Sequence, residues 1–276
     1  MREAVGVVGV GAMGMEMVRH LIERGLRVYA TDIDSQRMAK TQELGAKSAK
    51  TPKEMAHETD FSLVMVATDR QVEEVTIGDE GLLAGARTGH IVMIASTVHP
   101  KTCQIVAARG QHISVDVLDT PVVFGLEGAR SGTLTALVGG NASALAKAEP
   151  VLRAFCREII PMGPVGSGQF TKSCNNMLHW SFVVANYEAL SLAREWGIDP
   201  RKMREVLLRC PASNQTLERW MTHNLTWPQK DLGTVLELAE EFKLAVPLHG
   251  LVKQLMMNLT KDMTHGLMEV ADEKRP

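Results

Sequence analysis

The stretch AVGVVGVGAMGMEMVRHLIERG, residues 4–25, decides the fold of this chain. It opens with an apolar, Val-rich run from Ala4 to Val10, which is typical of a strand buried on both faces. A glycine-rich turn follows, and a helical pattern then runs to Gly25, a residue type that commonly ends helices. A buried strand that turns directly into a helix predicts the start of a parallel α/β sheet.

Three glycines in the turn each have a distinct physical role. Gly9 permits the tight turn, Gly11 leaves room for a pyrophosphate, and Gly14 lets the helix pack closely against the strand. Main-chain N–H groups at the start of the helix, together with its dipole, then face the phosphates. The sequence therefore predicts a dinucleotide site at Gly9, Gly11, Ala12, Met13 and Gly14.

The second predicted strand, Arg27 to Thr31, ends at Asp32, roughly 20 residues after the turn. A carboxylate at this point accepts hydrogen bonds from the adenosine ribose and repels a 2′-phosphate, and no Arg follows it immediately. We therefore expect NAD as the cofactor, in preference to NADP. The alternative is that Asp32 only caps the helix that begins near Ser35.

Strands and helices alternate as far as Gly163, which predicts an N-terminal Rossmann domain with a doubly wound, mostly parallel sheet. The later predicted strands span residues 62–67, 90–95, 113–117, 133–138 and 158–162. A Gly-rich segment then marks the boundary between domains 1–163 and 164–276. Beyond it we expect an all-α domain. Its predicted helices after the first span residues 200–208, 215–222, 232–244 and 247–257.

A long helix, Gln169 to Trp196, is predicted to enter the second domain, because its pattern contains neither Pro nor Gly. At about 100° per residue, Lys172, Asn176 and His179 share one stripe, with Asn175 at its edge. An ammonium group on a largely buried helix needs a polar partner, which a substrate in a cleft would supply. The alternative is a partly exposed lysine with amide neighbours.

The composition limits the classes of function. The net charge of −2, from 30 basic and 32 acidic residues, gives no basic surface for nucleic acid or an anionic membrane, so a small-molecule substrate is expected. No apolar run is long enough to span a membrane, and no secretory leader precedes the first strand. The four cysteines show no metal-ligand spacing, so we expect reduced thiols, no metal site and a cytoplasmic protein.

Four motifs, in order along nearly the whole chain, resemble those of the β-hydroxyacid dehydrogenase family. This group contains 3-hydroxyisobutyrate dehydrogenase and tartronate semialdehyde reductase and is related to 6-phosphogluconate dehydrogenase. The motifs are GVGAMGMEM at 9–17, SGTLTALVGG at 131–140, GSGQFTKSCNNML at 166–178 and QKDLGTVLELA at 229–239.

The resemblance implies an enzyme that interconverts a hydroxyl and a carbonyl with a nicotinamide cofactor. It implies that Lys172 is the general acid/base and that Asn176 helps to hold the substrate oxygen. Ser96 and Thr97 would lie near the nicotinamide ribose, and Lys230 would reach the cofactor or substrate. It also implies a homodimer or homotetramer, formed through the helical domain.

The chain departs from the family pattern where a serine and two glycines usually hold the substrate carboxylate. Here the residues are Val123, Phe124 and Gly125, so a hydroxyl is lost and an aromatic ring is added. We therefore expect a substrate other than a small unsubstituted 3-hydroxy acid bound in the usual way. An apolar or aromatic substituent packed against Phe124, or a carboxylate bound elsewhere, would fit these residues. His179, where the family usually has an apolar residue, and Trp227 are further candidates for lining the pocket. The alternatives are a structural role for His179 and interdomain packing for Trp227.

Two other functions stay open. One is a reductase of a non-acid carbonyl or an imine, and the other is a non-catalytic NAD-binding protein. The presence of Lys172, Asn176 and Lys230 together favours the dehydrogenase over both.

Overall fold

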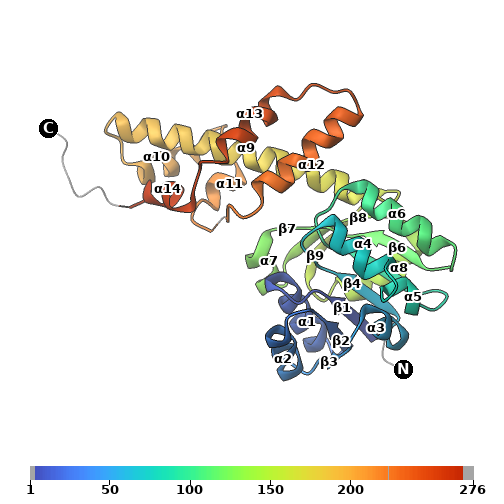
Figure 1. Cartoon of the computed structure of the whole chain (residues 1–276). Helices are drawn as coiled ribbons and strands as arrows, with labels where there is room; N and C mark the ends of the chain where they lie inside the picture. The colour runs from blue at the N-terminus through green and yellow to red at the C-terminus, as the bar shows by residue number, and fades with distance from the viewer. Residues whose placement is uncertain (1–3, 223, 270–276) are drawn as a thin grey trace. The chain divides into compact units, whose positions relative to one another are not determined.

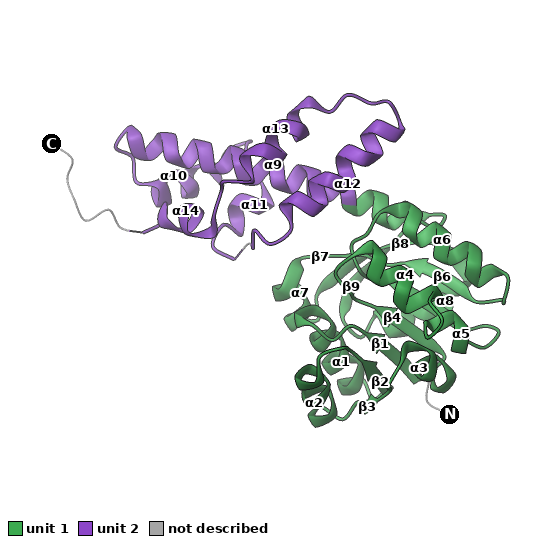
Figure 2. Ribbon diagram, in the orientation of Figure 1, with its two compact units in different colours: residues 1–172 green, residues 173–276 purple. Residues whose placement is uncertain are grey.

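The computed structural model describes residues 4–222 and 224–269. It divides into two compact units, residues 1–172 and 173–276 (Figure 2). This division falls inside the long helix α9, Ser167–Glu195, and so lies a little beyond the boundary at residue 163 that the sequence predicts.

The strands of the first unit form one sheet, in the order β3-β2-β1-β4-β5-β6-β8-β7 with β9 paired to β8 (Figure 1). Their bounds are β1 Ala4–Val8, β2 Arg27–Thr31, β3 Lys47–Ser48, β4 Phe61–Val64, β5 Ile91–Ile94, β6 Asp116–Asp119, β7 Val122–Val123, β8 Leu134–Gly139 and β9 Cys156–Gly163. From β3 through β6 all neighbours are parallel, whereas β8 runs antiparallel to β6 and β7. The predicted doubly wound, mostly parallel sheet is confirmed.

The direction of winding reverses between β1 and β4, which lie side by side. In sheets of this kind ligands bind at the carboxyl ends of the strands beside such a reversal. The turn after β1 and the segments after β4 and β5 therefore border the expected binding crevice.

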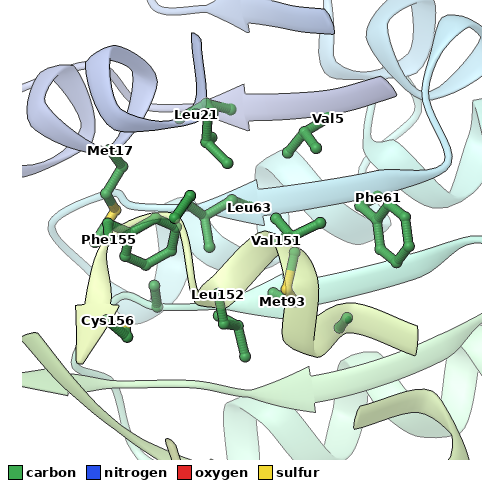
Figure 3. Close-up of a cluster of buried hydrophobic side chains, with 14 of the residues drawn as sticks. Val5, Met17, Leu21, Phe61, Leu63, Met93, Val151, Leu152, Phe155 and Cys156 are labelled. Carbon is green, nitrogen blue, oxygen red and sulfur yellow. The ribbon is translucent and has the colours of Figure 1, made fainter. Parts of the chain in front are cut away.

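Helices cover both faces of the sheet. Their bounds are α1 Ala12–Glu23, α2 Ser35–Glu43, α3 Pro52–Glu58, α4 Asp69–Ile77, α5 Leu82–Gly85, α6 Pro100–Gln111, α7 Gly125–Ser131 and α8 Ala142–Leu152. Successive strand residues point to opposite faces, so Ile91 and Met93 join one buried cluster while Val92 and Ile94 join another. Figure 3 shows the first cluster, in which Phe155 packs with side chains of α1 and the central strands.

The strand predicted at 113–117 begins later, at Asp116. The N–H groups of Ile113 and Val115 both donate to the carbonyl of Gly110, and Ser114 has φ +57°. These bonds make residues 113–115 the turn that follows α6. The two-residue strands β3 and β7 were not predicted, because each is too short to show an apolar periodicity.

The described residues of the second unit are helical apart from their connections, as predicted. After α9 come α10 Pro200–Leu207, α11 Gln215–Glu218, α12 Pro228–Glu241, α13 Pro247–Leu255 and α14 Lys261–Gly266. Two apolar clusters hold them, one around Trp180 and Leu232 and the other around Leu190 and Trp220.

Helix α9 is less buried than its sequence predicts. Leu178 is 54% exposed and Leu192 is 72% exposed, so one apolar side of the helix is uncovered in the single chain. None of the helices in the described part of the chain combines the length and apolar character that crossing a membrane requires.

Candidate active site

The turn after β1 requires glycine at two of its three predicted positions. Gly9 has φ +86°, and a Cβ placed there would lie 2.4 Å from the carbonyl oxygen of Met65. A Cβ on Gly14 would lie 2.1 Å from the carbonyl oxygen of Gly9, so helix and turn are in direct backbone contact. The tight turn and the close helix packing predicted for these residues are both present.

Gly11 is the N-cap of α1 and makes no side-chain cap. The only atom near a Cβ placed on it would be Nη1 of Arg37, at 3.8 Å, so this side of the turn is open. Ala12 is exposed, Met13 is half-buried, and the first N–H groups of α1 have no acceptor within the helix. An anionic group suits this position, because uncapped N–H groups and the helix dipole both favour negative charge.

Asp32 supports the same turn from the end of β2. Its Oδ2 accepts from the N–H of Val10 at 2.7 Å, and its Oδ1 accepts from the N–H of Asp34 at 2.9 Å. The cap of α2 is Asp34, whose Oδ1 accepts from the N–H groups of Gln36 and Arg37. The alternative reading of Asp32 as a helix cap is therefore wrong.

Arg37 is a neighbour of this site that sequence reasoning missed. Its Nη1 lies 3.9 Å from Oδ2 of Asp32, and its Nε lies 3.2 Å from Oδ2 of Asp34. It reaches the turn because it stands one helical turn into α2, a position that no local motif marks. The positive charge of this guanidinium lies beside the Asp32 carboxylate, which the sequence predicts to bind the adenosine ribose.

Ser96 and Thr97 follow β5 at the same edge of the sheet. Ser96 is 1% exposed, and its Oγ accepts from the N–H of Val66 at 2.8 Å and donates to the carbonyl of Val64 at 3.3 Å. Its hydroxyl thus ties β5 to the end of β4. Thr97 is half-buried. The predicted contact of both residues with a nicotinamide ribose stays a prediction.

Gln169 joins the start of α9 to the segment after β5. Its Oε1 accepts from the N–H of Val98 at 3.1 Å, and its Nε2 donates to the carbonyl of Ser96 at 2.7 Å. The side chain is fully buried. Because both halves of one amide are used, the first turn of α9 is fixed against the carboxyl end of β5.

Asp119, at the end of β6, anchors the same turn from the other side. Its Oδ1 accepts from the N–H of Gly166 at 2.7 Å and its Oδ2 from the N–H of Gln169 at 2.8 Å. Burial raises the pKa of the Asp119 carboxyl, and the main-chain donors partly offset that rise. Gly139 and Gly168 make the room, since a Cβ on either would lie within 3 Å of this carboxylate.

Lys172 stands three residues after Gln169, about 4.5 Å further along the axis of α9. Its side chain is half-buried. Asn176, one turn on, is 7% exposed, and Oδ1 of Asn176 accepts from Nδ2 of Asn175 at 3.2 Å. Lys172 and Asn176 therefore lie on one continuous helix, as predicted. The first turn of that helix is held by Asp119 and Gln169.

The segment after β7 has an unusual backbone. Phe124 has φ +83° and ψ 4°, the left-handed region that disfavours side chains, and Gly125 follows with φ +59°. The Phe124 ring packs against the first core cluster, and Val123 is half-buried opposite Thr135 in β8. The aromatic ring therefore takes part in the packing of the loop that carries it.

In the second unit, a cavity of about 420 Å³ surrounds the start of α12. Trp227, Lys230 and Met256 are among the residues that line it. Nζ of Lys230 lies 5.9 Å from the centroid of the Trp227 ring. The adjacent Asp231 accepts from Nε1 of Trp180 at 3.0 Å, which ties α12 to α9.

His179 makes a contact within the second unit. Its Nδ1 lies 3.1 Å from Oγ1 of Thr216, and its ring is tilted against that of Trp180 with centroids 4.8 Å apart. These contacts fix the ring on α9. Within the described ranges no three His, Cys, Asp or Glu side chains are grouped so as to hold a metal ion.

Two family models together match most of the chain. The NAD binding domain of 6-phosphogluconate dehydrogenase matches residues 4–163, and the NAD-binding domain of NADP-dependent 3-hydroxyisobutyrate dehydrogenase matches residues 166–271.

Individual proteins of known name are similar over almost the full length. A 3-hydroxyisobutyrate dehydrogenase of Pseudomonas aeruginosa is 31% identical, over 91% of this chain and 90% of that protein. The crystal structure of a 3-hydroxyisobutyrate dehydrogenase from Salmonella typhimurium superposes with a TM-score of 0.82 at 27% identity, over 92% of this chain and 93% of that one. A Streptomyces aurantiacus imine reductase, 16% identical with a TM-score of 0.67, shares the fold over 97% of this chain and all of its own length.

The two family models and the similarity to 3-hydroxyisobutyrate dehydrogenases show an NAD(P)-dependent oxidoreductase that acts on CH–OH groups. The chain belongs to the β-hydroxyacid dehydrogenase family.

Proposed function

We propose that Lys172 is the general acid/base of this enzyme and that Asn176 holds the substrate oxygen. The observation that carries the proposal is the double anchoring of the first turn of α9. Asp119 holds its main chain, and Gln169 bonds the segment after β5, so Lys172 stands one turn beyond the carboxyl edge of the sheet. Ligands of parallel α/β sheets bind at that edge.

The chemistry requires one proton and one hydride to leave the alcohol. The ε-amine of Lys172 takes the hydroxyl proton while the carbon–oxygen bond becomes a carbonyl, and in the reverse direction its ammonium returns the proton to the oxygen. The nicotinamide, when bound, accepts or supplies the hydride. The amide of Asn176 donates to the same oxygen and fixes its direction relative to the amine.

The cofactor is proposed to be NAD in preference to NADP. Gly11, Ala12 and Met13 would hold its pyrophosphate, and Asp32 would accept hydrogen bonds from its adenosine ribose. The carboxylate of Asp32 repels a 2′-phosphate, although the nearby Arg37 weakens that repulsion. Thr97, with Ser96 fixing its backbone, faces the nicotinamide ribose.

The substrate is proposed to be a hydroxy acid that is larger than the small unsubstituted 3-hydroxy acids. Val123 offers no hydroxyl to a carboxylate, and Phe124 adds apolar surface at the loop that precedes Gly125. Asn175 and His179 on α9 and Lys230 on α12 are proposed as further residues that contact substrate or cofactor.

The protein is proposed to be cytoplasmic and to form a homodimer or homotetramer through the helical unit. The exposed side chains of Leu178 and Leu192 on α9 supply apolar surface for such an interface. Equilibrium sedimentation of the whole chain measures the oligomeric state. A monomer at micromolar concentration would refute the proposed homodimer or homotetramer.

A reductase of a non-acid carbonyl or an imine is the second candidate, because an imine reductase shares the fold. A non-catalytic dinucleotide-binding protein is the third. The presence of Lys172 and Asn176 one turn apart on α9 favours the alcohol dehydrogenase over both.

Absorbance at 340 nm with NAD+ at alkaline pH tests the proposal on three probes. These are 3-hydroxyisobutyrate, 2-benzyl-3-hydroxypropanoate and the uncharged analogue 2-methyl-1,3-propanediol. We expect turnover of the benzyl acid above that of the small acid. Preference for the small acid would overturn the substrate assignment, preference for the diol would favour the non-acid carbonyl, and silence with all three would favour the non-catalytic protein.

A further inference from the structure

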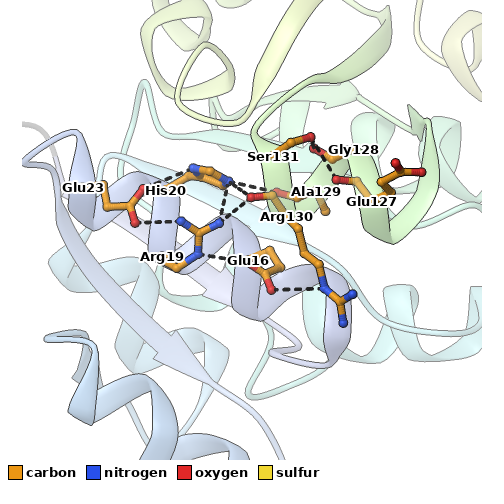
Figure 4. A network of polar contacts seen from close by, with 9 residues as sticks. All are labelled: Glu16, Arg19, His20, Glu23, Glu127, Gly128, Ala129, Arg130 and Ser131. Carbon is orange, nitrogen blue, oxygen red and sulfur yellow. Dashed lines mark hydrogen bonds and ion pairs between the residues drawn. The ribbon is translucent and has the colours of Figure 1, made fainter.

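Arg19 and His20 of α1 hold the carboxyl end of α7 (Figure 4). Nη2 of Arg19 donates to the carbonyl of Arg130 at 2.6 Å, and Nε2 of His20 lies 2.9 Å from the carbonyl of Ala129. Donors and positive charge are favourable at the carboxyl end of a helix, because its last carbonyls lack partners within the helix. We call this set of contacts the α1–α7 clamp.

Acidic residues of α1 fix the two donors of the clamp. Nε of Arg19 pairs with Glu16 at 2.9 Å, and its Nη1 pairs with Glu23 at 2.7 Å. Nδ1 of His20 lies 3.3 Å from Oε2 of Glu23. Carboxylates thus hold two nitrogens of the guanidinium, and the third, Nη2, is aimed at α7 and also lies 3.0 Å from Nε2 of His20.

The clamp leaves no space for a side chain at the residue that ends α7. Gly132 has φ +67°, and a Cβ placed on it would lie 2.9 Å from the His20 ring. The imidazole therefore packs directly on the backbone of Gly132 as well as approaching the carbonyl of Ala129.

The other end of α7 carries the backbone strain at Phe124, its N-cap. A side chain in the left-handed region is strained and persists only where the surroundings hold it. The Cβ of Phe124 would lie 2.8 Å from a Cβ on Gly128, so this residue is packed against α7 itself. Loop and helix form one body, and the clamp fixes that body from its far end.

We propose that Arg19 and His20 are positioning residues that hold the loop 123–125 in the conformation that recognises substrate. Because both stand on α1, the helix whose amino end faces the dinucleotide, the clamp sets the loop at a fixed place relative to the cofactor. This inference rests on the proposed function in one respect, that the loop contacts the substrate.

Hydrogen–deuterium exchange of the whole chain tests the clamp without any substrate. Loss of a hydrogen bond from a charged donor corresponds to about a tenfold change in an opening equilibrium. In Arg19→Ala we therefore expect amides of residues 121–132 to exchange about tenfold faster, and in Arg19→Lys less than that. Arg24→Ala, an equal loss of charge at the exposed end of α1, is the matched control. Wild-type exchange in Arg19→Ala would overturn the proposal.

Kinetics separate a positioning role from a merely structural one. In Arg19→Ala and His20→Gln we expect the KM for 2-benzyl-3-hydroxypropanoate to rise about fivefold, with kcat and the Kd for NAD+ changed by less than about twofold. A lower melting temperature with unchanged KM would overturn the proposal.

The double variant Val123→Ser with Phe124→Gly shows which assumption fails. If it moves KM while Arg19→Ala does not, the loop contacts substrate and the clamp is overturned. If neither moves KM although exchange is faster, the substrate role of the loop fails, and the proposal fails with it.

Discussion

Replacement of Asp119 should loosen the helix that carries Lys172. Asp119→Ala leaves the buried N–H groups of Gly166 and Gln169 without their acceptor. Bonds to a charged acceptor contribute about 1.5 to 3 kcal/mol each, so the two together amount to about 3 to 6 kcal/mol. The carboxylate is itself penalised by burial, as its raised pKa indicates, so we expect a loss of about 3 kcal/mol, at the lower end of that range.

Asp119→Asn keeps one acceptor oxygen, so it should cost about half as much, about 1 to 2 kcal/mol. Urea unfolding followed by far-ultraviolet circular dichroism measures these losses, with Asp116→Asn on the same strand as the control. We also expect kcat to fall about tenfold or more, with the Kd for NAD+ nearly unchanged, because the anchor is next to the catalytic helix and not to the dinucleotide turn. An unfolding free energy of Asp119→Ala within about 0.5 kcal/mol of wild type would refute the anchoring role.

Three further predictions concern other parts of the first unit. Burial lowers the pKa of His90 to about 4 from its usual 6.5, so the unfolded chain binds the proton more tightly, and stability should fall by about 3 kcal/mol as pH drops from 6.5 to 4, at about 1.4 kcal/mol per pH unit. Urea unfolding of His90→Gln should lack this loss, whereas exposed His112→Gln should retain it; equal pH dependence in both would contradict the reasoning. Asp32→Ala should raise the Kd for NAD+ about tenfold and lower the preference over NADP+, and an unchanged preference in a fluorescence titration would mean that the ribose is read elsewhere. Val123→Ser with Phe124→Gly should raise kcat/KM for 3-hydroxyisobutyrate about tenfold, and no gain would assign specificity to other residues.

The parts of the fold that could be predicted rest on local patterns. Gly9 and Gly14 are recognisable because turn geometry and helix packing leave no room for a Cβ. Lys172 and Asn176 could be placed on one stripe because α9 contains no helix breaker around them. For Gly14, Lys172 and Asn176 the physical constraint lies within a few residues along the chain. Gly9 is recognised from the glycine spacing of its turn, although its nearest contact is the distant carbonyl of Met65.

The supporting contacts could not be predicted, because their partners are far apart in sequence. Asp119 and Gln169 are separated by 50 residues, and Arg19 and Arg130 by 111. A buried carboxylate, a buried amide and an arginine on a surface helix all have common structural roles, and no spacing rule links one to another. The sequence predicts the helix that carries Lys172, whereas the contacts that hold this helix are evident only in the folded structure.

The start of β6 shows a different reason why a strand boundary could not be predicted from sequence. Alternating apolar residues from Ile113 onward fit a strand in either of two positions, and the deciding feature is the carbonyl of Gly110, which accepts from Ile113 and Val115. Phe124 is a similar case, because nothing in its identity signals a positive φ.

The central claim is that Lys172 moves the proton, and Lys172→Ala tests it most directly. With NAD+ and 2-benzyl-3-hydroxypropanoate we expect kcat to fall about a hundredfold or more, while the Kd for NADH, measured by fluorescence, changes by less than about twofold. Exposed Lys147→Ala, in which the same charge is lost from α8, should retain full turnover. Turnover by Lys172→Ala at the wild-type rate would contradict the account, because another group would then have to carry the proton.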